Sequence, residues 1–235
     1  MKKFGLLGYN ISYSLSPKIH AEYYEANEIK ASYELVDTAS LSSVLDRLRF
    51  LDGFNVTQPY KQEILEYIDE LMTDAGAVNT VKVANNKLIG YNTDGAGFLA
   101  HIRELGDAAR LKDKDVLILG AGGAAAAIVP VVKAESAKVY IHNRSVDKAK
   151  ALGTIADLPK LKPQVIINCT TLGLEGEDCL PNGIDLSKLE FAYDTIYNPP
   201  ETPFLKKAKM CGAIIANGYR MLECQAYEAI KIWLA

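Results

Sequence analysis

The chain has 235 residues, of which 49% are hydrophobic and 23% are charged, and its formal net charge is −3. These are values of an ordinary globular protein with one large domain or two small ones, and they exclude a largely disordered chain. The near balance of 26 basic against 29 acidic residues argues against a general binder of nucleic acid or of anionic membranes.

In the first part of the chain, short apolar runs alternate with helix-like segments. Ser16 and Pro17 predict a helix start, with Ser16 as the N-cap and Pro17 at the first helical position. The Asn85-Asn86 pair tolerates positive φ and predicts a hairpin. In chain order we expect a strand over 4–8, a helix from 16, a strand over 32–36, a short helix over 41–50, a strand over 53–56, a helix over 60–71, strands over 78–84 and 87–91, and a helix over 94–105.

The polar stretch 106–114 indicates the entry to a second unit. The continuous apolar run 116–119 is typical of a strand buried on both faces. The remaining expected elements are a helix over 123–134, a strand over 138–142, a helix over 146–152, strands over 165–168, 191–195 and 213–216, and a last helix within 218–235. This alternation predicts an α/β protein with two parallel-sheet domains, the first over 1–100 and rejoined by 218–235, the second over 101–217.

The four cysteines form no C-x-x-C pair and no metal-ligand spacing with the three histidines, so we expect free thiols and no metal site. Residues 116–132 carry no charge, but their glycines, alanines and Pro130 suit a buried strand, turn and helix better than a membrane span. The apolar run at the N-terminus is too short for a signal peptide. We therefore expect a soluble, cytoplasmic protein with no membrane and no nucleic-acid partner.

A glycine-rich segment, Gly120-Ala121-Gly122-Gly123-Ala124-Ala125, fits the pattern G-x-G-x-x-G/A with alanine in the last place. It directly follows a predicted buried strand and opens a predicted helix, and a second strand follows at the spacing of a βαβ unit. Such glycines let backbone N–H groups approach a pyrophosphate, so the segment predicts a Rossmann-like, doubly wound dinucleotide domain. The alternative is a glycine-rich turn needed only for close packing.

The second strand of that unit ends at Asn143-Arg144-Ser145, where an NAD site usually has an acidic residue. Arg144 instead offers a planar set of donors for a 2′-phosphate, and Ser145 and Lys148 could add contacts. This favours NADP over NAD. The alternative is a solvated Arg144 beside a Ser145 that caps the next helix.

Several polar residues of the first part lie at predicted element ends, among them Lys61 at a strand-to-helix transition. Such donors and acceptors suit a small, polyhydroxylated anion. These donors and acceptors lie in four sequence blocks: Ser14-Leu15-Ser16-Pro17, Asn55-Val56-Thr57-Gln58-Pro59-Tyr60-Lys61, Gly76-Ala77-Val78-Asn79-Thr80 and Asn92-Thr93-Asp94-Gly95-Ala96-Gly97.

With these blocks in this order, the chain resembles the shikimate dehydrogenase family over nearly its whole length. The resemblance implies an N-terminal α/β substrate domain, a Rossmann-like NADP domain with the active site in the cleft between them, and reversible NADPH-dependent reduction of 3-dehydroshikimate to shikimate. Oligomeric state is open between monomer and homodimer. One departure bears on the site: Arg220 stands where the family usually has glycine, in a segment that lies near the nicotinamide in the family.

The resemblance also implies residue roles. Lys61 is the proton donor or acceptor, and Asp94 orients it. The substrate carboxylate is bound by Ser14 and Ser16 with help from Tyr197. The ring hydroxyls are contacted by Thr57, Lys61, Asn79, Asp94 and Gln225. NADP is held by Gly120, Ala121, Gly122, Gly123, Ala124, Asn143, Arg144, Ser145 and Lys148, and the nicotinamide end is lined by Thr195, Gly218 and Met221.

Taken singly, these residues have ordinary alternatives as helix caps, packing or solvated side chains. Two other functions compete with the dehydrogenase. One is a quinate/shikimate dehydrogenase, in which NAD use would be more common. The other is a non-catalytic sensor of the same ligands, which should have lost Lys61 or Asp94, although both are present.

Overall fold

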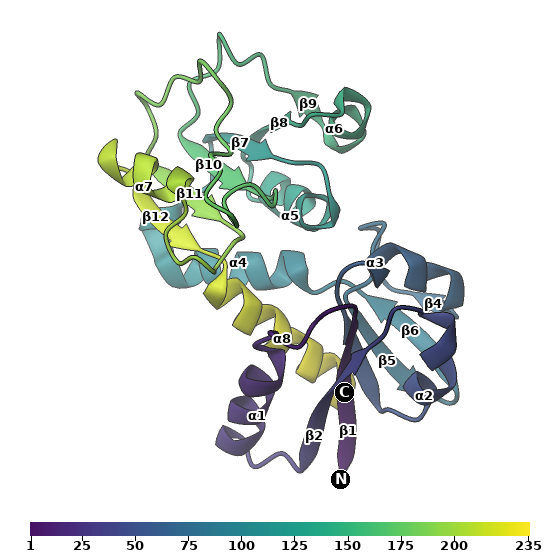
Figure 1. The fold of residues 1–235 in the computed structure, drawn as a ribbon. Coiled ribbons are helices and arrows are strands. Elements are labelled where there is room, and N and C mark those ends of the chain that lie inside the picture. Colours follow the sequence, from purple (N-terminus) through teal and green to yellow (C-terminus); the bar gives the residue numbers. More distant parts are fainter. The chain divides into compact units, whose positions relative to one another are not determined.

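A computed structural model describes residues 1–235. The chain divides into two compact units, whose elements are labelled in Figure 1. The first comprises Met1–Asp94 and Glu223–Ala235, and the second comprises Gly95–Leu222. The chain leaves the first unit at the start of α4 (Asp94–Leu105) and returns to it within α8 (Tyr219–Leu234). None of the helices has the length and hydrophobicity that crossing a bilayer requires.

The first unit contains a six-stranded mixed sheet in the order β2-β1-β3-β5-β6-β4. Its strands are β1 (Lys2–Gly8), β2 (Ala31–Asp37), β3 (Gly53–Val56), β4 (Glu70–Leu71), β5 (Thr80–Ala84) and β6 (Lys87–Tyr91). Strands β1, β2 and β3 are parallel, whereas β5 is antiparallel to both β3 and β6. The predicted parallel arrangement is therefore present in β2, β1 and β3, and the antiparallel strands make the whole sheet mixed. The hairpin of β5 and β6 was predicted correctly: Asn85 and Asn86 have φ of 50° and 62° and reverse the chain.

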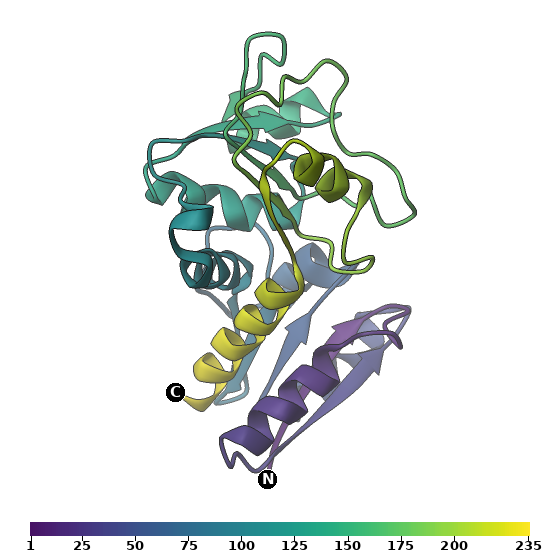
Figure 2. The same cartoon turned by 90° about the vertical axis from the view of Figure 1, so that its left-hand side faces the viewer.

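The helices of the first unit are short. They are α1 (Ser16–Ala26), α2 (Leu45–Arg49) and α3 (Tyr60–Glu63), with 3-10 turns over Ser42–Val44 and Ile64–Tyr67. Figure 2 shows α1 lying along the strands of this sheet. The C-terminal part of α8 packs on the same sheet: the Trp233 Nε1 donates to the Val81 carbonyl at 2.9 Å, and a Cβ at Gly53 would lie 2.4 Å from the Trp233 ring. Only glycine at position 53 admits this indole.

Two predictions in this unit are wrong. The helix expected over 60–71 stops early, because Ile68 is extended and Glu70–Leu71 pairs with β6. Ser16 is not the N-cap of α1 but its first residue. The preceding Leu15 already has helical dihedral angles and occupies the cap position, so the Ser16 hydroxyl is not placed to cap the helix.

The second unit contains a parallel sheet in the order β12-β11-β10-β7-β8-β9. Its strands are β7 (Asp115–Leu119), β8 (Lys138–His142), β9 (Thr154–Ile155), β10 (Val165–Asn168), β11 (Phe191–Asp194) and β12 (Ile214–Asn217). This is the doubly wound order, with the change of direction between β7 and β10, and such sheets bind ligands at the carboxyl ends of these two strands. The Rossmann-like prediction is confirmed.

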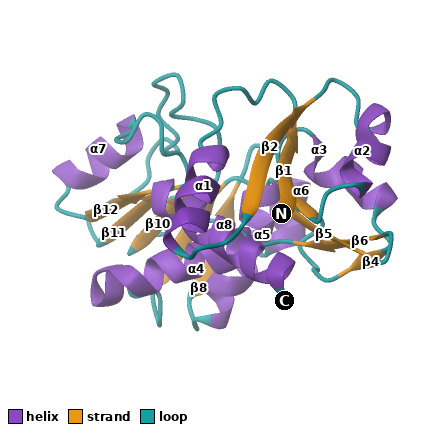
Figure 3. Ribbon diagram, turned by 90° about the horizontal axis from the view of Figure 1, so that it is seen from below, coloured by secondary structure: helices purple, strands orange, loops and turns teal.

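The helices of this unit are α4, α5 (Gly123–Ala134), α6 (Val146–Leu152) and α7 (Pro203–Met210). A 3-10 turn over Gly106–Ala109 directly follows α4. Figure 3 distinguishes them from the strands. Apolar residues of β7 and β10 are buried in two clusters, with Val116, Ile118 and Ile167 in one and Leu117 and Ile166 in the other. The sheet is therefore buried on both faces, as its continuous apolar runs predict. The short β4 and β9 and helix α7 were not predicted.

Candidate active site

Lys61 lies where β3 passes through a tight turn into α3. The Tyr60 N–H donates to the Thr57 carbonyl at 3.0 Å, which closes the turn, and the Lys61 carbonyl accepts from the Val78 N–H at 2.8 Å. The backbone of Lys61 is thus fixed on both sides, and its side chain is 26% exposed. The predicted strand-to-helix placement is confirmed.

The Lys61 ammonium is paired with Asp94, the first residue of α4. Lys61 Nζ lies 2.7 Å from Asp94 Oδ2, and the Asp94 side chain is 11% exposed. The other carboxylate oxygen, Oδ1, accepts from Asn79 Nδ2 at 2.8 Å. The Asp94 N–H donates to Asn92 Oδ1 at 3.0 Å, which fixes the start of the helix. Because both oxygens of Asp94 accept from donors, the geometry suits an ionised carboxylate facing an ammonium group.

Asn79 and Gln225 complete this group. Asn79 Oδ1 accepts from the Thr93 N–H at 2.8 Å, so the amide nitrogen must face Asp94. The same nitrogen lies 3.4 Å from Gln225 Oε1, which α8 brings from the far end of the chain. Both side chains are buried. The structure therefore brings together four predicted site residues, Lys61, Asn79, Asp94 and Gln225.

The predicted carboxylate-binding serines lie after β1. The Ser14 hydroxyl accepts from the Ser16 N–H at 3.2 Å, and Ser16 is buried. Thr57 follows β3, and its N–H donates to the Leu7 carbonyl at 2.9 Å. Because β1 and β3 are parallel neighbours, the segments that follow them leave the same edge of the sheet. Tyr197, predicted as a helper, lies in the second unit after β11.

Several buried or partly buried polar residues behind this group had no role assigned to them from the sequence. They are His20, Tyr33, Thr80 and Thr93, together with Asn55, which was quoted only as part of a motif. Asn55, Thr80, Thr93 and His20 are all at most 5% exposed. Thr80 has no sequence signal that separates it from an ordinary strand threonine. The polarity of Asn55 at a position predicted to be inside a buried strand was the one usable signal.

In the second unit, the glycine-rich turn follows β7. Gly120 has φ of 103°, and a Cβ there would lie 3.0 Å from Thr170 Cγ2, so only glycine fits. Gly122 precedes α5 in an extended conformation, and a Cβ on it would meet no atom within 4 Å. Gly123 and Ala124 form the first turn of α5, and Ala121 precedes Gly122. The protein does not itself fill the space beside Gly122, which leaves room for a ligand against the helix N-terminus.

Arg144 and Lys148 lie in the turn after β8 and in α6. Both side chains are exposed and make no ion pair within the chain. The Asn143 amide donates to the Ser145 carbonyl at 2.9 Å, and Ser145 holds the N-cap position of α6 without a side-chain capping bond. β8 is the neighbour of β7, so these cations follow the strand next to the glycine turn. Their donors suit a phosphate group.

Thr195 and Gly218 approach each other through their backbones. A Cβ at Gly218 would lie 2.1 Å from the Thr195 carbonyl oxygen, and the Gly218 N–H donates to the Ile196 carbonyl at 3.2 Å. Met221 is buried in the apolar core of this unit. Arg220 is held by Glu104 of α4, with Nε to Oε2 and Nη2 to Oε1 both at 2.7 Å. The departure at position 220 is thus accommodated by a two-point ion pair.

Asp194 fixes the loop that carries Thr195 and Tyr197. Its carboxylate accepts from Asn168 Nδ2 at 3.0 Å, from the Ile196 N–H at 3.0 Å and from the Thr202 hydroxyl at 2.6 Å. Burial raises the pKa of Asp194, while these donors act in the opposite direction.

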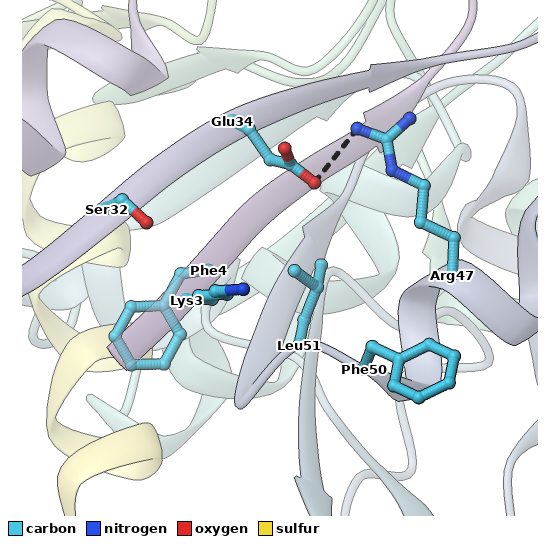
Figure 4. A pocket seen from close by; sticks show the side chains of 7 residues that line it. All are labelled: Lys3, Phe4, Ser32, Glu34, Arg47, Phe50 and Leu51. Carbon is cyan, nitrogen blue, oxygen red and sulfur yellow. Dashed lines mark hydrogen bonds and ion pairs between the residues drawn. The ribbon is translucent and has the colours of Figure 1, made fainter. Parts of the chain in front are cut away.

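A separate hollow on the first unit contains none of the predicted site residues (Figure 4). It is lined by Lys3, Phe4, Ser32, Glu34, Arg47, Phe50 and Leu51. Lys3 and Ser32 belong to the first residues of β1 and β2, whereas ligands of open α/β sheets bind at carboxyl ends. Its Glu34 and Arg47 pair with each other at 3.0 Å. We assign this hollow no role.

Comparison with known proteins identifies the family. The family model described as "Shikimate dehydrogenase substrate binding domain" matches residues 6–81, and that described as "Shikimate / quinate 5-dehydrogenase" matches residues 103–163. The shikimate dehydrogenase (NADP(+)) of Caldicellulosiruptor saccharolyticus is 38% identical over 99% of this chain and 92% of its own length. That of Pelagibacter ubique is 37% identical over 99% and 93%.

The chain belongs to the shikimate dehydrogenase family. The structure agrees: shikimate 5-dehydrogenase from Thermus thermophilus, solved in complex with NADP(H) and shikimate, superposes with a TM-score of 0.92 at 33% identity, over 99% of this chain and 93% of the other. The family resemblance predicted from the sequence blocks is confirmed.

Proposed function

We propose that this chain is an NADP-dependent shikimate dehydrogenase, which reversibly reduces 3-dehydroshikimate to shikimate. The observation that carries the proposal is the group formed by Lys61, Asp94 and Asn79. An ammonium, a carboxylate and an amide are held within hydrogen-bond distance at the edge of one sheet. Relatives named shikimate dehydrogenase (NADP(+)) match the chain over nearly its whole length.

In the proposed reaction, Lys61 moves the proton. Hydride addition to a ketone leaves negative charge on its oxygen, and the Lys61 ammonium can donate a proton to that oxygen. In the direction of oxidation, the neutral amine accepts the hydroxyl proton. Asp94 holds Nζ at 2.7 Å and so limits the positions from which Lys61 can act. Asn79 and Gln225 offer further donors and acceptors for ring hydroxyls.

The carboxylate end of the substrate is assigned to Ser14 and Ser16, with Thr57 on the neighbouring segment. The family resemblance implies Tyr197 as a helper. The supporting observation is that the segments after β1 and β3 leave the same edge of the sheet as parallel neighbours. We accordingly propose that the first unit is the substrate domain and the second the cofactor domain.

The residues of the second unit fit NADP. The open space beside Gly122 and the start of α5 suit the pyrophosphate, and the unpaired Arg144 and Lys148 suit a 2′-phosphate, with Asn143 and Ser145 beside them. Thr195, Gly218 and Met221 are proposed to line the nicotinamide end. When bound, the reduced nicotinamide supplies the hydride. The proposal includes a cytoplasmic location, which suits the four free cysteines.

The test is the initial rate of cofactor reduction by the purified protein, followed by absorbance, with shikimate or quinate and with NADP or NAD. The proposal expects the highest kcat/KM with shikimate and NADP. A higher value with quinate and NAD would favour the quinate/shikimate dehydrogenase. A folded protein that turns over none of the four pairs would contradict a dehydrogenase of this substrate class.

A further inference from the structure

We propose that Asn55 is a positioning residue: its buried amide, together with the Thr80 hydroxyl, holds Asn79 and thereby aims the Lys61–Asp94 pair. This inference rests on the proposed function and deepens it. Neither Asn55 nor Thr80 is among the residues to which the family resemblance assigned a role.

The Asn55 side chain is 5% exposed and its hydrogen-bonding groups are engaged on both sides. Oδ1 accepts from the Tyr33 hydroxyl at 2.8 Å. Nδ2 donates to the Asn79 carbonyl at 3.2 Å and to Thr80 Oγ1 at 3.0 Å. The Asn79 carbonyl can only accept, so it must face the amide nitrogen, and the amide oxygen then faces the Tyr33 hydroxyl, which donates. The orientation of the amide is therefore determined: oxygen toward Tyr33, nitrogen toward Asn79 and Thr80.

Two routes lead from the Asn55 amide to Asn79. The first is the direct bond to the Asn79 carbonyl. The second passes through Thr80, which stands opposite Asn55 in the antiparallel pairing of β3 with β5 and is fully buried. Thr80 Oγ1 lies 3.3 Å from Thr93 Oγ1, and the Thr93 hydroxyl also lies 3.3 Å from Asn79 Oδ1. The Asn55 amide therefore holds the backbone of Asn79 directly and its side chain through Thr80 and Thr93.

Asn79 transmits this constraint to the reacting group. Its amide nitrogen bonds Asp94 Oδ1 at 2.8 Å, and Asp94 Oδ2 bonds Lys61 Nζ at 2.7 Å. A tilt of the Asn79 amide would release one carboxylate oxygen and let Asp94 rotate, which moves the ammonium. Small displacements of a proton donor lower turnover strongly, because proton transfer depends on its alignment.

On its other side, Asn55 is connected to the segment of Ser16. The Tyr33 ring stacks on His20 with centroids 3.9 Å apart and planes at 14°. His20 belongs to α1, which begins at Ser16. Asn55 therefore joins the segment proposed to bind the substrate carboxylate to the residues proposed to contact the ring hydroxyls. In this proposal it acts through Tyr33 and Asn79, to which its side chain is hydrogen-bonded.

The test uses Thr80→Val, which keeps the shape of the side chain and removes the hydroxyl, and Thr80→Ser, which restores the hydroxyl, beside Asn55→Asp, which removes the amide donors. Rates of shikimate oxidation with NADP are divided by the concentration of NADP-binding sites, so that loss of folded protein cannot imitate loss of turnover. We expect kcat to fall about three- to tenfold in Thr80→Val and roughly ten- to a hundredfold in Asn55→Asp. KM for NADP should stay within about twofold of the wild type, and Thr80→Ser should recover most of kcat.

A double mutant separates positioning from stability. If Thr80 acts through Lys61, then Thr80→Val in a Lys61→Ala background should lower kcat no further, whereas an independent effect would multiply. Unchanged kcat per site in both Thr80→Val and Asn55→Asp, with an active wild type, would overturn the positioning role alone. An inactive wild type with every substrate and cofactor pair would overturn the proposed function and this inference with it.

Discussion

The candidate sites of the two units are built from different groups, side chains in the first and mainly backbone in the second. In the first unit the candidate site consists of side chains: Lys61, Asn79 and Asp94 contact one another, and Asn55 and Thr80 hold them from behind. In the second unit the candidate site consists mainly of backbone, with glycines at sharp turns and exposed cations that have no partner in the chain. The first site is internally satisfied, whereas the second leaves donors open.

This difference follows from the proposed ligands. A small, hydroxylated substrate whose reacting atom must be placed accurately requires side chains whose own positions are locked. A phosphate-rich cofactor is held well by helix N-terminal N–H groups and by flexible cations, which tolerate small displacements. We therefore expect changes in the first unit to act mainly on kcat and changes in the second to act mainly on KM for the cofactor. The following predictions test that division.

The largest effect is expected at Lys61. Lys61→Ala removes the proton donor, so kcat should fall roughly 10²- to 10⁴-fold, with KM for NADP nearly unchanged. Steady-state kinetics with shikimate and NADP measures both. Lys87→Ala is a matched control, because Lys87 is an exposed lysine of the same unit that pairs with Glu70 at 2.6 Å. It should leave kcat unchanged, and an active Lys61→Ala would remove Lys61 from the mechanism.

A smaller effect, on the other parameter, is expected at Arg144. Arg144→Ala removes the planar donors proposed for the 2′-phosphate, so KM for NADP should rise about ten- to a hundredfold while KM for NAD changes little. Lys150→Ala, at an exposed lysine of the helix that follows, serves as the control. Equal changes in KM for NADP and KM for NAD would show that Arg144 does not bind the 2′-phosphate.

Gly122→Ala tests the space beside α5. The added methyl group meets no protein atom within 4 Å and φ is −95°, so the thermal unfolding midpoint should stay within about a degree or two of the wild type. If the pyrophosphate occupies that space, KM for NADP should rise several-fold. Gly218→Ala is the contrasting variant: its Cβ would lie 2.1 Å from a backbone oxygen, and it should unfold at a clearly lower temperature. An unchanged KM in Gly122→Ala would place the cofactor elsewhere.

The last prediction concerns the pH dependence of stability that the buried His20 of the first unit causes. Burial lowers the pKa of His20 from 6.5 to about 3. Between these two values the unfolded chain binds a proton that the folded chain does not, so stability falls as the pH is lowered from about 6.5 toward 3.

His20→Phe should abolish this contribution, which is at most about 1.4 kcal/mol per pH unit. Urea unfolding of both proteins at several pH values in this range measures it. The wild type should lose stability more steeply than the variant as the solution is acidified. Parallel curves would show that His20 does not titrate differently in the folded and unfolded chains.

Sequence reasoning worked best where local chemistry decides the structure. The hairpin at Asn85-Asn86 and the helix over 123–134 follow from local φ preferences and from the glycine turn, and both are present in the structure. The helix expected over 60–71 failed because sheet pairing of Glu70–Leu71 with β6 overrode its local periodicity.

The site was predictable only in part, for the same reason. The sequence blocks indicated Lys61, Asn79, Asp94 and Gln225, and the structure brings them together. The residues behind them were not predictable, because the role of Thr80 depends on its register opposite Asn55, and no pattern along one strand encodes the register of another.

The most direct test of the division between the two units is the ratio of kcat/KM for NADP to kcat/KM for NAD, measured with shikimate in the wild type, Lys61→Ala and Arg144→Ala. The account predicts that Lys61→Ala lowers turnover with both cofactors and leaves the ratio as in the wild type, while Arg144→Ala lowers the ratio at least about tenfold and leaves kcat close to the wild-type value. A ratio that changes in Lys61→Ala but keeps its wild-type value in Arg144→Ala would contradict the proposed division between the two units.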